Sequence, residues 1–148
     1  MRYDRTMEVS DVRRRLRAAI DEAKRHSAER RARVDAASRA WEETLPVIVV
    51  PAFHALSQAL AAEGHRFHVL TPGESARLSV ERSAEEFVEL ALDTARETPA
   101  VMLRSTRGRG RRMVSSERVV VAGEAIAQLT QEAVVGLLLE ELIPFIER

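Results

Sequence analysis

The chain has 148 residues, of which 23 are basic, 23 are acidic and 45% are hydrophobic. This size and apolar content are typical of one domain with a buried core, and they argue against disorder of the whole chain. The absence of cysteine excludes disulfides, thiolate metal sites and cysteine nucleophiles. Lys24 is the only lysine, a bias that we interpret as the mark of a GC-rich bacterial genome. Residues 1–25 are charged where a secretory signal would be apolar, so we expect a cytoplasmic protein.

The zero net charge hides an alternation of charged blocks. Residues 1–40 and 101–118 each carry a net charge of +5, whereas 41–100 and 119–148 are net acidic. Such blocks can neutralise one another within a chain or between copies, or they can attract a foreign polyanion.

The segment from Met7 to about Leu45 predicts a long, charged helix, because it contains no glycine or proline and is rich in Arg, Ala and Glu. We expect Ser10 to be its N-cap, with Asp11 in the first turn. Apolar residues recur every three or four positions and form a thin stripe at Val9, Val12, Leu16, Ala19, Ile20, Ala23, Val34, Ala37, Trp41 and Leu45. A narrow stripe suits a short coiled coil or packing against the rest of the domain. Within a single domain of residues 1–148, we therefore interpret 1–45 as an extended helix and 46–148 as an α+β head.

Residues 44–62 carry no charge, so a membrane span has to be considered. Pro46 and Pro51 lie inside the segment, and the polar residues His54, Ser57 and Gln58 share one helical face. We therefore predict an amphipathic core helix that is kinked near the two prolines and ends at Gly64, with no membrane partner.

After Gly64 the hydrophobic pattern changes from helical to alternating. It predicts a first strand that begins at Phe67 and four further strands near residues 76–80, 88–92, 101–104 and 113–121. Turns are expected at 71–73 and 108–110. A final helix is expected from Gln131 to Ile146, capped by Thr130 and apolar around most of its circumference. The predicted fold class is α+β: the long helix, a four- to five-stranded antiparallel meander and a C-terminal helix, with the helices covering one face of the sheet.

The most distinctive local feature is a run of arginines between residues 104 and 118. Its members are Arg104, Arg107, Arg109, Arg111, Arg112 and Arg118. Glycines between them let the backbone approach a ligand, and the guanidinium groups could bind phosphate oxygens. The run could equally be a hairpin tip kept soluble by charge, with arginines paired to acidic helices. No aromatic residue lies between Phe87 and Phe145, although nucleic-acid modules usually use aromatic side chains for base stacking.

Reaction-specific motifs are absent from the sequence. There is no Walker A loop, no GxSxG turn and no dinucleotide-binding glycine motif, so we expect no enzymatic activity and no cofactor. His65 and His68 are three positions apart, which places them on opposite faces of a strand, and we therefore expect no metal site.

The sequence favours a non-enzymatic interaction or assembly module with an unidentified protein partner. We expect a homodimer that forms through Val12, Leu16, Ile20, Leu138 and Leu142. The alternative is a sequence-nonspecific nucleic-acid-binding protein that uses the arginine-rich hairpin 104–118.

Overall fold

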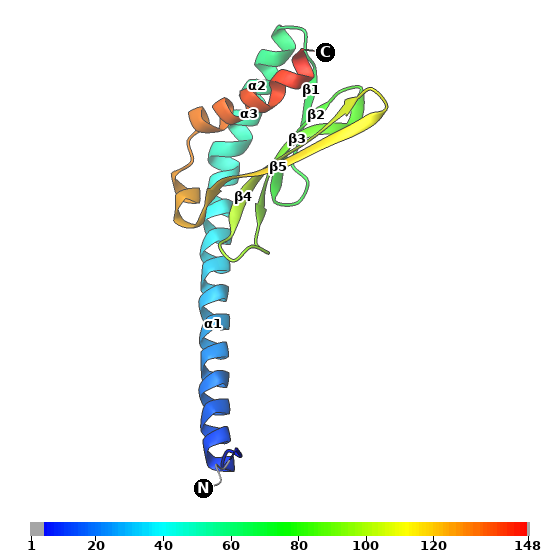
Figure 1. The fold of residues 1–148 in the computed structure, drawn as a ribbon. Coiled ribbons are helices and arrows are strands. Elements are labelled where there is room, and N and C mark those ends of the chain that lie inside the picture. Colours follow the sequence, from blue (N-terminus) through cyan, green and yellow to red (C-terminus); the bar gives the residue numbers. More distant parts are fainter. Residues whose placement is uncertain (1–4, 148) are drawn as a thin grey trace.

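The computed structural model describes residues 5–147 and has the predicted α+β architecture (Figure 1). Its helices are α1 (Val9–Thr44), a π-helical segment η1 (Leu45–Val49), α2 (Val50–Ala62), a 3-10 helix η2 (Gly123–Gln128) and α3 (Gln131–Ile146). Its strands are β1 (Phe67–Leu70), β2 (Ser75–Val80), β3 (Ser83–Asp93), β4 (Ala100–Arg109) and β5 (Arg112–Ala122). The long helix, the sheet and the C-terminal helix follow one another in the predicted order.

The five strands form a meander in the order β1-β2-β3-β4-β5, and every neighbouring pair is antiparallel. Arg109 pairs with Arg112, so the β4–β5 turn consists of Gly110 and Arg111, and Gly110 has a φ of 63°. The predicted turn at 108–110 was therefore placed too early, because Gly108 still pairs with Met113 in the ladder.

The core lies between the sheet and a layer formed by the end of α1, α2 and α3. Its largest fully buried side chains include Trp41, Phe53, Leu78, Leu90 and Leu138. Trp41 is 1% exposed, and its Nε1–H donates a hydrogen bond to the Glu74 carbonyl oxygen at 2.6 Å. This bond fixes the last turns of α1 to the start of β2.

The helical chain passes through both prolines without breaking. Pro46 lies in the π-helical segment η1, and Pro51 lies in the first turn of α2. A proline has no backbone N–H to donate to the preceding turn. The wider π turn is one way in which a helix accommodates such a residue. At the other end of α2, Gly64 has a φ of 89°, and the N–H of His65 donates to the Leu60 oxygen at 2.8 Å. The predicted stop at Gly64 is confirmed.

A stretch inside the helical run Val9–Ala62 is long and apolar enough to cross a membrane, judged by length and composition alone. In the fold, its buried side chains are Val49, Ala52, Phe53, Leu56 and Leu60. They belong to the same core cluster as the sheet residues. The predicted role of this segment as an amphipathic core helix is confirmed.

The two predicted helix caps had different outcomes. Thr130 caps α3 as expected, since its hydroxyl accepts a hydrogen bond from the Ala133 N–H at 3.1 Å. The prediction for Ser10 was wrong. Glu8 has the extended backbone of the N-cap and its carbonyl accepts the first bonds, so that Ser10 lies inside the first turn of α1.

Candidate functional site

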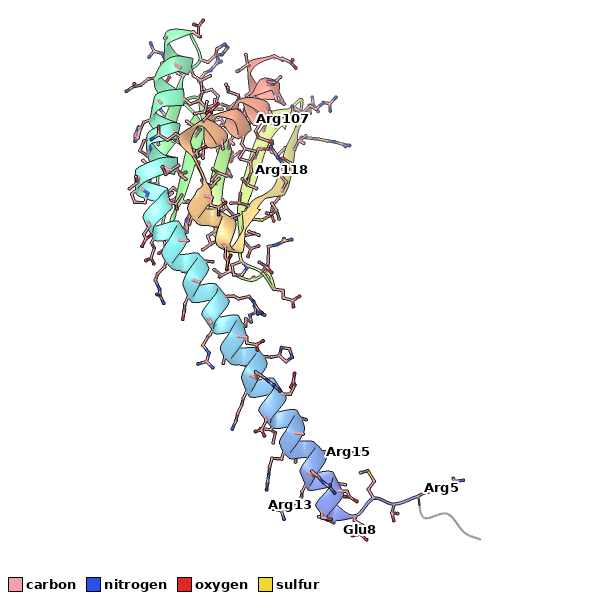
Figure 2. All side chains as sticks on the ribbon, turned by 90° about the vertical axis from the view of Figure 1, so that its left-hand side faces the viewer. Arg5, Glu8, Arg13, Arg15, Arg107 and Arg118 are labelled. Carbon is pink, nitrogen blue, oxygen red and sulfur yellow. The ribbon has the colours of Figure 1, made fainter. Side chains whose placement is uncertain are left out.

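The N-terminal part of α1 protrudes from the head as a rod. Every residue from Val12 to Arg33 is exposed, and Figure 2 shows Glu8, Arg13 and Arg15 far from the sheet. The β3–β4 loop is the first part of the head to meet the helix. Arg30 donates to the Ala95 oxygen at 3.4 Å, and Arg33 donates to the Glu97 oxygen at 3.3 Å. We call residues 9–29 the free part of α1.

The apolar stripe on the free part continues the face that packs against the head. Val12, Leu16 and Ile20 are 47%, 57% and 44% exposed. At about 100° per residue, Val12 and Leu16 lie within roughly 20° of Trp41 on the helix circumference. Ala37 and Trp41, farther along the same face, are buried. The head therefore covers one half of the stripe, and nothing among residues 5–147 covers the other half.

The charges beside the stripe differ between its two sides. One side carries only basic residues, Arg13, Arg17 and Lys24. The other side carries three acidic residues and one arginine, namely Asp11, Glu22, Glu29 and Arg15, and Glu8 precedes the helix on this side. Ion pairs within the helix, such as Arg14 with Asp11 and Arg25 with Glu22, are exposed and stabilise it little. The free part of α1 thus has a basic side and a mostly acidic side.

Leu138 and Leu142, the part of the predicted dimer interface that lies on α3, are in the core. Leu138 and Leu142 have no exposed surface, because this face of α3 packs towards the sheet. A side chain buried within the protomer cannot form a surface for a second copy, so this part of the prediction was wrong. The large apolar residues that α3 exposes are Leu139 and Ile143, at 46% and 49%.

The six arginines of the β4–β5 hairpin fall into two groups. Two of them are engaged in ion pairs, since Arg104 Nε contacts Glu117 at 2.9 Å and Arg118 contacts Glu140 at 3.6 Å and Glu141 at 4.0 Å. The other four, Arg107, Arg109, Arg111 and Arg112, form no ion pair within the described part of the chain. Figure 2 shows the contrast between Arg118, on the body of β5, and Arg107, near the end of the hairpin.

The four unpaired arginines are gathered at the hairpin end. Arg107 pairs with Val114 and Arg109 with Arg112, so Arg107, Arg109 and Arg112 project from one face of the two-stranded ribbon. Arg111 occupies the turn. An open hollow of about 790 Å³ separates this face from the end of α3 and also contains Glu86 and Glu147. Glu86 Oε1 accepts a hydrogen bond from the Gly108 N–H at 2.6 Å, which ties the ribbon to β3.

A row of charges that the sequence pattern does not reveal crosses the other face of the sheet. In the strand register Arg77 is opposite Glu89, Glu89 is opposite Arg104, and Arg104 is opposite Glu117. Arg77 contacts Glu89 at 2.5 Å and also stacks on the Phe87 ring, 3.9 Å from its centroid. These side chains line a shallow hollow of about 300 Å³. Positive and negative charges alternate, so the row neutralises itself and favours no particular charged ligand.

A metal site would need several ligand side chains close together. Among residues 5–147 no three His, Asp or Glu side chains gather as metal ligands. Every buried side-chain nitrogen or oxygen in the same range has a hydrogen-bond partner. No protein-family model, curated protein or solved structure matches the chain. The candidate functional surfaces are therefore the free part of α1 and the end of the β4–β5 hairpin.

Proposed function

We propose that the chain is a non-enzymatic interaction module that assembles as a homodimer through the free part of α1. The observation that carries this proposal is the exposed stripe of Val12, Leu16 and Ile20 on the same helix face as the buried Trp41. An apolar stripe on a protruding helix is typical of a surface that a partner helix covers. The role of the pairing is to hold two heads together so that each can bind a further protein.

The charges beside the stripe favour a second copy in parallel orientation. In a parallel helix pair, one side of the stripe faces the opposite side of the partner's stripe. The basic side with Arg13, Arg17 and Lys24 then lies along the acidic side of the second copy. In an antiparallel pair the basic side of one helix faces the basic side of the other, so these three basic residues would lie against their own copies. The partner that fits the charge pattern is therefore the same helix of a second copy, in parallel orientation.

The pairing is expected to be weak. Residues 9–29 span about three heptads, or roughly 30 Å of helix. Few large apolar side chains lie on this stretch, and burying each one fully contributes about 1.5–3 kcal/mol. Association costs about 4–15 kcal/mol in lost translational and rotational freedom. We therefore expect a dissociation constant on the order of micromolar to tens of micromolar.

Sedimentation equilibrium over a range of concentrations tests the proposal. The wild-type chain should pass from monomer to dimer, whereas Leu16→Glu/Ile20→Glu should stay monomeric because it introduces two charges into the stripe. The matched control is Ala18→Glu/Ala32→Glu, which introduces the same two charges on the opposite face of α1. This control should dimerise like the wild type.

Two results would contradict the proposal. One is a wild-type chain that stays monomeric at a few hundred micromolar, well above the expected dissociation constant. The other is a dimer that Leu16→Glu/Ile20→Glu leaves intact, which would place the interface elsewhere. Neither residue contacts the head, so circular dichroism of both variants should match the wild type.

A further inference from the structure

The end of the β4–β5 hairpin extends beyond the part of β4 that pairs with β3. The β3–β4 register ends at the pair of Phe87 and Thr106, whereas β4 and β5 stay paired as far as Arg109 and Arg112. The yellow end of this hairpin projects away from the helices in Figure 1. Residues 107–114 thus form a two-stranded ribbon, and its turn is exposed to solvent. A two-stranded ribbon of this kind is narrow enough to enter the major groove of B-form DNA.

The charge on the ribbon is available to a ligand. Arg104 and Arg118 are neutralised by Glu117, Glu140 and Glu141, so they attract a polyanion weakly. Arg107, Arg109, Arg111 and Arg112 form no ion pair among residues 5–147. Their guanidinium groups carry donors that match phosphate oxygens. At the turn, Gly110 has no neighbouring atom within 4 Å of where a side chain would be, so its backbone is open to a ligand.

We propose that this ribbon binds the phosphate backbone of a nucleic-acid duplex without sequence preference, through Arg107, Arg109, Arg111 and Arg112. The ribbon has no aromatic side chain on which an unpaired base could stack, so a duplex fits better than a single strand. The open hollow beside the ribbon is lined by Glu86 and Glu147 together with Arg107 and Arg109. The two acidic residues direct the duplex towards the outer end of the ribbon. The proposal does not depend on dimerisation, since each protomer carries its own ribbon.

The binding should be strongly salt-dependent. Each neutralised phosphate contributes about −0.9 to the slope of log K against log salt concentration, so four arginines give a slope of about −3.6 per ribbon. From about 50 to 200 mM salt, the affinity should fall on the order of a hundredfold.

Fluorescence anisotropy of labelled duplex DNA and duplex RNA with the 148-residue chain tests the proposal. Arg109→Ala/Arg111→Ala/Arg112→Ala should reduce the steepness of the salt slope by about 2.7 per ribbon. The corresponding Arg→Lys triple variant should retain most of the slope, because it keeps the charge. The matched control is Arg31→Ala/Arg39→Ala/Arg96→Ala, which removes the same charge from three exposed arginines elsewhere. It should bind like the wild type.

Three results would overturn the proposal. The first is the absence of salt-sensitive binding by the wild type at about 50 mM salt, where phosphate contacts are strong. The second is an equal loss of binding in the ribbon variant and in the matched control, which would indicate only a general effect of net charge. The third is binding of polyglutamate, lost in the ribbon variant, with no binding of either duplex, which would identify an acidic peptide as the ligand.

Discussion

Arg77 and Glu89 form the most tightly enclosed ion pair among the described residues. Arg77 Nε donates to Glu89 Oε2 at 2.7 Å, and Arg77 Nη2 lies 2.5 Å from the same oxygen. The Glu89 side chain is 8% exposed and the Arg77 side chain 28%. The two residues are direct partners across β2 and β3, and Phe87 supports the guanidinium from one side. This pair anchors the row of charges on the open face of the sheet.

Glu89→Gln should lower the free energy of unfolding by about 1–3 kcal/mol, because it leaves the partly buried Arg77 without its counter-charge. The cost is smaller than for a fully buried pair, since Arg77 retains some contact with water. Glu117→Gln is the matched control, because Glu117 pairs with Arg104 in the same row but is 50% exposed. It should cost less than about 1 kcal/mol. Urea unfolding followed by the fluorescence of the buried Trp41 measures both, and equal losses would contradict the difference in burial.

A chain that begins at Ser27 should keep a folded head with unchanged stability. Of the described residues that are removed, 5–26, all but the half-buried Asp11 are exposed, and none belongs to the core cluster. The free energy of unfolding should stay within about 0.5 kcal/mol of the value for residues 1–148, as is usual for changes at exposed positions. The truncated chain should also be monomeric at every concentration. A loss of cooperative unfolding would show that the head depends on the free part of α1.

The ion pairs of the hairpin predict unequal effects of its arginines on duplex binding. Arg118→Ala should change the salt slope less than Arg109→Ala, because Glu140 and Glu141 already neutralise Arg118. The expected reduction in steepness is about 0.9 for Arg109→Ala and well below that for Arg118→Ala. Anisotropy titrations at three or more salt concentrations give both slopes. Equal slopes would mean that the ion pairs of Arg118 open when the duplex binds.

Much of the fold could be predicted from local signals in the sequence. The bounds of α3 were predicted correctly because Thr130 is a strong cap and because apolar residues continue as far as Ile146. The strands were predicted because alternation identifies a half-solvated strand. The face of α3 that enters the core could not be predicted, because apolar residues surround most of that helix. Leu138 and Leu142 were therefore assigned to a surface that the fold buries.

The candidate surfaces could be predicted only in part. The stripe of Val12, Leu16 and Ile20 is visible in the sequence, but its exposure depends on where the head packs along α1. The arginine run is equally visible. Its division into paired and unpaired residues depends on α3 lying beside β5, which brings Glu140 and Glu141 to Arg118. Contacts between distant segments depend on the register and the packing of whole elements, and one sequence does not specify these.

Disulfide crosslinking of a single introduced cysteine tests the parallel pairing of α1 most directly. The chain has no cysteine of its own, so the only thiol in Val12→Cys is the introduced one. In a parallel pair in register, the two copies of residue 12 lie within the few ångströms that a disulfide requires. Mild oxidation should convert most of Val12→Cys to a covalent dimer, whereas Ala18→Cys, on the opposite face of α1, should stay monomeric. No crosslink at residue 12, or equal crosslinking at both positions, would contradict the proposed dimer.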